Sequence, residues 1–137
     1  MGIRDMARVR SLMLERDVQG LVSVLCDESR PGPERRFAAA ALGDLHVTQA
    51  VGPLVSVLDD AKVCEAAIQA LVSIGDPIAA APLAELFASA EDRVLRKTAE
   101  RALFRLNEKD PRRVRSVLEG FERAKNQHGG KPKHGGR

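Results

Sequence analysis

The segment Leu21-Val-Ser-Val-Leu25 recurs almost letter for letter as Leu54-Val-Ser-Val-Leu58. Looser copies follow at Leu83-Ala-Glu-Leu-Phe87 and at Val114-Arg-Ser-Val-Leu118. The four copies start 33, 29 and 31 residues apart, so the chain has a period near 31 residues. A period of about 20 to 50 residues is typical of stacked repeats, in which each repeat covers the apolar face of its neighbour. The recurrence therefore predicts a solenoid, an architecture that usually works as a binding surface.

Each repeat is predicted to contain two helices. The recurring segment belongs to the first, helix A, because its apolar residues are spaced three and four apart. The second, helix B, carries the pattern Ala-x-x-Ala-Leu-x-x-Leu/Ile, which begins at Ala38, Ala67 and Ala99. We expect an all-α fold, a short right-handed α-α superhelix of about three and a half helical hairpins.

Glycine and aspartate residues mark the expected helix ends. Gly43 and Gly75 follow the apolar pattern of helix B, where a helix often ends in a left-handed residue. The pair Asp76-Pro77 predicts an N-cap followed by proline at the first helical position. Asp60 and Asp92 are expected to cap the following B helices in the same way.

Three segments are expected along the chain. Residues 1–16 are predicted to form an N-terminal capping helix, because a terminal repeat must cover one open end of the core. Residues 17–124 form the repeat array. Residues 125–137 are a basic tail rich in Gly, His and Lys, which has almost no apolar side chain to bury and is expected to be disordered.

The composition is that of a folded domain whose basic character lies at one end. The chain of 137 residues has four Phe and no Trp or Tyr, so Ala, Leu and Val must build the core. Residues 1–109 carry 14 Lys and Arg against 16 Asp and Glu, whereas residues 110–137 carry 8 against 3. The net charge of +3 therefore comes from the C-terminal end.

The sequence disfavours a membrane-spanning protein and a secreted protein. No apolar stretch reaches the length of a membrane span, and the N-terminus lacks the apolar region of a secretory signal. The two cysteines have no framework spacing, which indicates reduced thiols. We therefore expect a cytoplasmic protein without a membrane partner.

The end of helix B and the start of the next helix A resemble a known repeat. The best stretch is Ala67-Ile-Gln-Ala-Leu-Val-Ser-Ile-Gly-Asp76, followed by Ala79-Ala-Ala-Pro-Leu83. It resembles HEAT-like repeats of the phycobilisome-lyase type over roughly residues 17–124, which implies an armadillo-like superhelix. Such repeats occur in many unrelated proteins, so the resemblance indicates a fold more than a function. The family often has Arg early in helix B; Arg96 keeps it, whereas Cys64 replaces it in the second B helix.

Catalysis, metal binding and cofactor binding are not predicted. His46, His128 and His134 stand apart from carboxylate partners. Some HEAT-like proteins are di-iron hydroxylases built on His-Glu pairs, and the chain contains no His-Glu dipeptide. Cys26 and Cys64 have no neighbouring His to activate them. We therefore expect a protein that is not an enzyme and holds no cofactor or metal.

One group of residues stands out as a candidate binding site. In the third B helix, four cations recur at intervals of four residues and spread over only about 120° of the helix surface. This cationic stripe consists of Arg93, Lys97, Arg101 and Arg105, and Arg112 and Arg113 can extend it from the next helix. It is either a solvated face or a site for an acidic protein segment or a nucleic-acid backbone.

Composition favours a protein partner. Single-strand binders need aromatic platforms for base stacking, and the chain has no Trp or Tyr, whereas duplex binding needs only Lys and Arg. The matching positions of the second B helix are Glu65, Gln69 and Ser73, so the surface is not uniformly basic. The favoured function is a non-catalytic scaffold that presents a concave B-helix face to a partner with an acidic segment. The alternatives are backbone-directed nucleic-acid binding and a tetrapyrrole-handling lyase subunit, the last implied only by the resemblance.

Overall fold

The computed structural model describes residues 3–129, and every regular element in this range is helical. It has eight α-helices and two short 3₁₀ turns, η1 (Thr48–Ala50) and η2 (Pro77–Ala79). In chain order the helices are α1 (Ile3–Leu14), α2 (Val18–Cys26), α3 (Gly32–Leu45), α4 (Val51–Ser56), α5 (Cys64–Ile74), α6 (Ala80–Ser89), α7 (Arg93–Lys109) and α8 (Pro111–Gly129).

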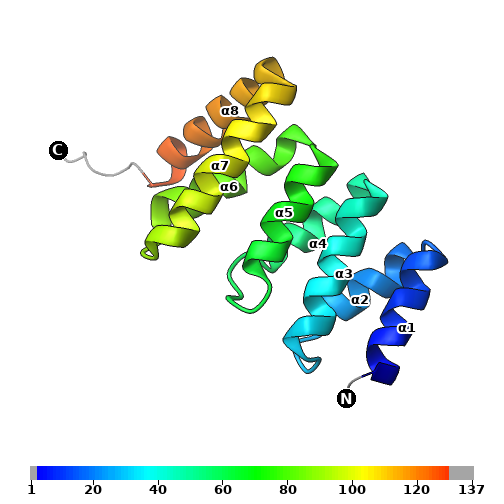
Figure 1. The fold of residues 1–137 in the computed structure, drawn as a ribbon. Helices are drawn as coiled ribbons and strands as arrows, with labels where there is room; N and C mark the ends of the chain where they lie inside the picture. The colour runs from blue at the N-terminus through cyan, green and yellow to red at the C-terminus, as the bar shows by residue number, and fades with distance from the viewer. Residues whose placement is uncertain (1–2, 130–137) are drawn as a thin grey trace.

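The helices form two layers, and the array extends from α1 at one end to α7 and α8 at the other. Figure 1 shows α1, α3, α5 and α7 side by side in one layer, with α2, α4 and α6 behind them. The recurring A segment falls in α2, α4, α6 and α8, and the B pattern falls in α3, α5 and α7. The prediction of an all-α solenoid built from A and B helices is therefore confirmed.

The core is built from the residues that repeat. Leu21, Leu54 and Leu83, which open three copies of the A segment, are each 0% exposed. Leu42 and Leu71 occupy the same place in successive B helices and are also completely buried. Near-identity of the copies thus reflects a shared packing position, because the same side chain fills the same space in each repeat.

The most extensive contact between helices joins α3 to α5, and a glycine makes it possible. A Cβ atom added to Gly43 would lie 2.8 Å from the Cα of Ala70, so only glycine fits at this crossing. The prediction that Gly43 ends helix B is wrong: α3 continues to Leu45, and His46 takes the left-handed conformation with φ 54°. The matching prediction for Gly75 is confirmed, since it ends α5 with φ 75°.

A buried arginine ties the first two repeats together. Arg35 in α3 is 1% exposed. Its Nε donates to the carbonyl of Leu25 at 2.9 Å, and its Nη1 donates to Oδ2 of Asp60 at 2.9 Å. Asp60 was expected to cap α5, but Val63 holds that position and Asp60 faces Arg35 instead. A buried guanidinium needs such partners, because an unpaired buried charge costs several kcal/mol, about 3 to 5.

Two other predicted N-caps are found in the structure. Asp92 precedes α7, and its Oδ1 accepts the backbone N–H of Val94 at 2.9 Å. Asp76 accepts the N–H of Ile78 at 3.0 Å, with proline at the first position of η2, which leads into α6. Satisfying these N–H groups stabilises a helix start by about 1 kcal/mol.

The array ends in α1 and α8, and α8 is longer than expected. At the N-terminal end, α1 packs against α2 and α3, and its Val9 is 0% exposed. At the C-terminal end, α8 runs to Gly129, so the helix extends into the segment that was expected to be a disordered tail. Its last residues include Arg123, Ala124 and Lys125, which are good helix formers and need no burial to remain helical. Residues 130–137 lie outside the described residues. Within residues 3–129, none of the helices combines the length and apolarity that crossing a bilayer requires.

Candidate functional site

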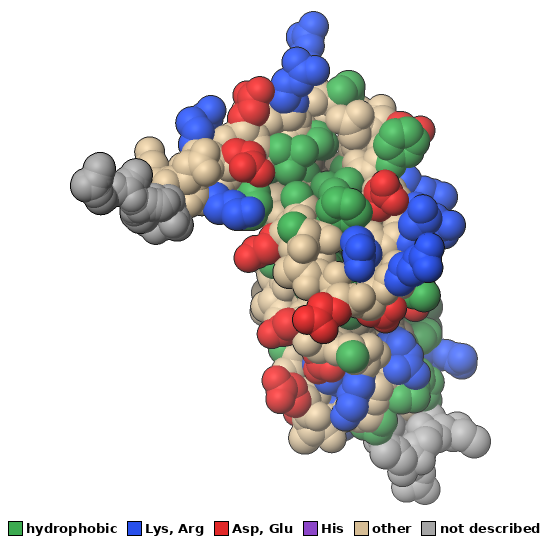
Figure 2. All heavy atoms as spheres, turned by 90° about the vertical axis from the view of Figure 1, so that its left-hand side faces the viewer, with side chains coloured by type: hydrophobic (Ala, Val, Ile, Leu, Met, Phe, Trp, Pro, Cys, Tyr) green, Lys and Arg blue, Asp and Glu red, His purple; other side chains and the backbone are tan. Residues whose placement is uncertain are grey.

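The helix α7 positions the cationic stripe by burying its opposite face. Ala99, Ala102 and Leu106 are at most 3% exposed and face the rest of the array. Because a helix places residues four apart on one side, this burial turns the stripe toward solvent. All four of its members are exposed: Arg93, Lys97, Arg101 and Arg105. Figure 2 views the C-terminal end of the molecule and shows Lys and Arg side chains gathered along its right-hand edge.

Among residues 3–129, most of the stripe has no acid partner. Lys97 pairs with Glu100 at 3.9 Å, but both side chains are more than half exposed. A pair of this kind contributes at most about 1 kcal/mol. Arg101 and Arg105 form no ion pair with any described residue. Their guanidinium groups therefore remain available to an external anion.

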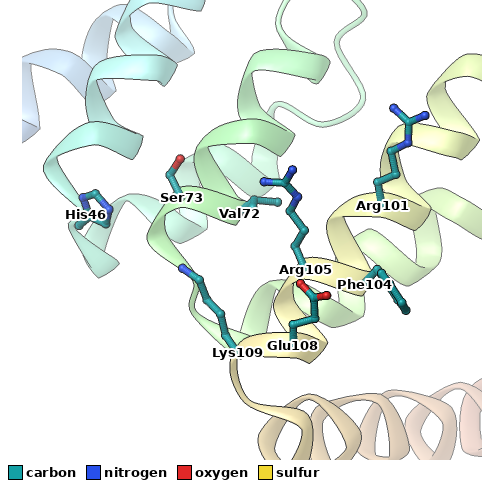
Figure 3. A pocket seen from close by; sticks show the side chains of 8 residues that line it. All are labelled: His46, Val72, Ser73, Arg101, Phe104, Arg105, Glu108 and Lys109. Atoms are coloured by element: carbon teal, nitrogen blue, oxygen red, sulfur yellow. The ribbon is translucent and has the colours of Figure 1, made fainter.

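A cleft separates α5 from α7, and Arg101 and Arg105 stand in its wall. Its wider part has a volume of about 680 Å³ and also contacts Val72 and Ser73 of α5. A narrower part of about 160 Å³ continues between the same helices and shares Val72, Arg101 and Arg105 with the first. Figure 3 shows Arg105 reaching from α7 toward Val72. The two parts form one cleft along the junction, and this α5–α7 cleft is the candidate site.

The cleft exists because α7 packs less extensively on α5 than α5 packs on α3. Aligning the B patterns places Val72 of α5 where α3 has Gly43, and Ala102 of α7 where α5 has Ala70. Val72 and Ala102 both line the narrow part of the cleft. A valine side chain prevents the backbone contact that a glycine allows, so the third repeat stands farther from the second.

Lys109 and His46 are among the lining residues of the cleft that were not predicted from the sequence. Lys109 follows Arg105 by four residues and so continues the periodicity of the stripe, which would have been enough to find it. Its side chain lies beside Gly75, where an added Cβ would meet its Nζ at 2.8 Å. An ammonium group at this place is favoured by the negative end of the α5 dipole. His46 directly follows α3, and no local signal joins it to α7 because its position depends on the left-handed conformation that ends α3.

Residues 18–103 match the family model for HEAT repeats, which is more than half of the chain. The chain belongs to the HEAT-repeat family. HEAT repeats generally mediate protein–protein interactions, and the family is typically a non-catalytic scaffold. No curated protein matches the chain.

Arg112 and Arg113 lie apart from the cleft of this HEAT array. Both are exposed in the first turn of α8, after the turn that ends α7. The backbone N–H of Arg113 donates to Oδ1 of Asp110 at 3.2 Å, which fixes the start of the helix. Neither side chain lines the α5–α7 cleft. The structure therefore brings together Arg101 and Arg105 with Lys109 and leaves this second arginine pair on a neighbouring helix.

Within residues 3–129, the cysteine side chains of the HEAT array are not activated as nucleophiles, and its His, Cys, Asp and Glu side chains do not form a metal site. Cys64 is buried, and this burial, followed by the negative charge of Glu65, Asp59 and Asp60, raises the pKa of its thiol. A raised pKa leaves less thiolate, which is the nucleophilic form. Cys26 is exposed. Among residues 3–129, no group of three or more His, Cys, Asp or Glu side chains is placed to hold a metal ion.

Proposed function

We propose that this HEAT array is a non-catalytic cytoplasmic scaffold that binds an acidic segment of a protein partner on its B-helix face. The B-helix face is the exposed side of α3, α5 and α7. The observation that carries the proposal is the pair Arg101 and Arg105, which stand in a cleft without an acid partner among the described residues. In a family that generally binds proteins, such a pair favours an anionic contact. Unpaired cysteines support a reducing compartment.

Charge reversal within the cleft tests this proposal. The double substitution R101E/R105E should weaken binding of a fluorescein-labelled peptide of ten glutamates by about tenfold or more, which corresponds to about 1.4 kcal/mol. Two attractive contacts are lost and two repulsive ones are created. Fluorescence anisotropy at about 0.15 M ionic strength, where the Debye length is about 8 Å, gives the dissociation constants, and circular dichroism shows whether the helices persist.

The matched control is R112E/R113E, which makes the same change in charge on α8 outside the cleft. It should weaken peptide binding by less than about threefold, because exposed charges more than a Debye length apart are largely screened. Equal losses in the two variants would show that net charge alone governs binding. Unchanged binding in R101E/R105E would mean that the stripe is only a solvated face.

Nucleic-acid binding is the second candidate, favoured by the exposed Arg112 and Arg113 at the start of the helix that follows the stripe. The same anisotropy assay with a labelled duplex DNA distinguishes nucleic-acid binding from binding of an acidic protein segment. Backbone binding predicts an affinity that falls steeply with salt and drops for R112E/R113E as much as for R101E/R105E. The tetrapyrrole-handling role was implied by the phycobilisome-lyase resemblance alone, and the match to HEAT repeats in general adds no support for it.

A further inference from the structure

We infer that the α5–α7 junction is an opened inter-repeat cleft that takes up an extended acidic segment of the partner. This inference rests on the proposed function and specifies where and how the segment binds. The lining residues of α7 run from Thr98 to Lys109. At a rise of 1.5 Å per residue they cover about 16 Å. A fully extended chain advances about 3.3 Å per residue, so the cleft accommodates about five residues.

The α5–α7 junction differs from the α3–α5 junction by identifiable substitutions. At the α3–α5 junction, Gly43 allows the backbones of the two helices to touch at Ala70. At the α5–α7 junction, Val72 occupies the place of Gly43 and faces the cleft together with Ala102. The wider spacing between α5 and α7 is therefore caused by one side chain of α5, that of Val72.

The α5–α7 junction also lacks, among residues 3–129, the ion pair that ties the α3–α5 junction. Arg35 pairs with Oδ2 of Asp60 at the α3–α5 junction. The matching residues at the α5–α7 junction are Cys64 and Asp92. Oδ1 of Asp92 accepts the N–H of Val94, as Oδ1 of Asp60 accepts that of Lys62. Oδ2 of Asp92 has no side-chain partner among the described residues, because the residue that would supply a guanidinium is a cysteine.

Charge is distributed unevenly along the cleft. Arg101, Arg105 and Lys109 line it from the α7 side and outnumber the one carboxylate of the wide end, Glu108, whereas Glu65 lies at the narrow end. Figure 3 shows Arg105 and Lys109 reaching toward α5, while Phe104 points away from it. Carboxylates of a bound segment are attracted to the wide end and repelled from Glu65. The occupant that fits this charge is an acidic segment whose carboxylates lie toward Lys109, with small side chains against Val72.

The test fills the cleft without changing its charge. Val72→Phe places a bulkier side chain between α5 and α7 and should weaken binding of the labelled deca-glutamate peptide by about tenfold or more. Val22→Phe is the matched control, because Val22 is a half-buried valine on α2, outside the cleft, and the same enlargement there should leave affinity within about twofold. Circular dichroism and the melting temperature of both variants are measured beside the anisotropy.

A second variant approaches the same question from the opposite direction. C64R/V72G copies the chemistry of the α3–α5 junction onto the α5–α7 junction, with the new arginine facing Oδ2 of Asp92. It should draw α7 toward α5 and weaken peptide binding while raising the melting temperature relative to V72G alone. If Val72→Phe does not fold, the C64R/V72G variant shows whether the peptide binds inside the α5–α7 cleft.

The outcomes separate this inference from the proposed function. If R101E/R105E weakens binding but Val72→Phe and C64R/V72G do not, the peptide binds on the outer surface and the cleft inference is overturned while the proposed function stands. If neither charge reversal nor cleft filling changes the affinity, both are wrong. If duplex DNA binds and the peptide does not, the occupant is a nucleic acid and the acidic-segment inference is overturned.

Discussion

At the scale of single residues, the pair Arg35 and Asp60 shows how a side chain can serve a purpose other than the one its position suggests. Asp60 precedes a B helix and resembles a cap, yet its Oδ2 accepts a hydrogen bond from a buried guanidinium 25 positions earlier in the chain. Two hydrogen bonds hold the pKa of the Asp60 carboxyl below its usual value of 3.8. The larger effect comes from the backbone N–H of Lys62 and the smaller one from the guanidinium of Arg35.

This pKa gives the protein a predictable acid sensitivity. A carboxyl whose folded pKa is lowered stabilises the fold fully above its unfolded pKa, and that contribution is lost as pH falls through the folded value. Asp60→Asn should therefore lower the urea midpoint of unfolding at pH 6. It should also reduce the further decrease of that midpoint between pH 6 and about pH 3. Asp27, whose pKa is also lowered, stays in place and preserves part of the drop. If the variant and the wild type lost equal stability over this range, the pair would contribute nothing to acid sensitivity.

At the scale of helices, Gly43 determines how closely two elements approach. The sequence pattern suggested the end of a helix, because glycine after an apolar run commonly ends one. In the structure, the same glycine lies inside α3 and is buried against Ala70. Local signals cannot distinguish the two roles, since both follow from the absence of a Cβ atom and only a second helix shows which applies.

Gly43→Ala is expected to destabilise the protein by about 1 to 3 kcal/mol, although alanine is the better helix former. The new methyl group would lie 2.8 Å from a backbone atom, which cannot move without shifting α5. Gly52→Ala is the matched control, since no atom lies within 4 Å of its added Cβ, and it should be neutral or stabilising by up to about 1 kcal/mol. Urea denaturation followed by circular dichroism measures both. Equal effects at the two sites would show that the crossing tolerates the methyl group.

At the scale of the whole molecule, the array is not uniform along its length. Repeat proteins are stabilised by each repeat and by its interface with the next one. The α3–α5 interface has both the Gly43 contact and the Arg35 tie, and the α5–α7 interface has neither of them. Near the C-terminal end, Leu103 is only partly buried, although Leu42 and Leu71 at the same place in earlier repeats are completely buried.

Amide hydrogen exchange should reveal this gradient. We expect the amides of α7 and α8 to exchange at least about tenfold faster than those of α3 and α5, because opening at the weaker interface costs less free energy. The comparison uses buried positions only, and the exchange rates are corrected for sequence. Slowest exchange in α7 would contradict the weak junction, and with it the physical account of the cleft.

Much of the fold was predictable because it depends on local spacing. The apolar periodicity located A and B helices, and Gly75, Asp76 and Asp92 marked their ends as expected. The side of α7 that bears Arg101 and Arg105 also followed from the sequence, since the apolar stripe of one helix defines which side faces water. Whether the stripe binds a partner is a separate question, which spacing along one helix does not answer.

The sequence by itself determined the repeat, the two-helix unit, the core leucines and the exposed stripe, since each arises from contacts that recur every three, four or about 31 residues. Only the tertiary structure decided that Val72 separates α7 from α5, that Lys109 and His46 line the same cleft as Arg105, and that Arg35 reaches Asp60. These relations join segments from different repeats. Their distances are set by the volume of side chains packed between helices, a quantity that no periodicity along the chain contains.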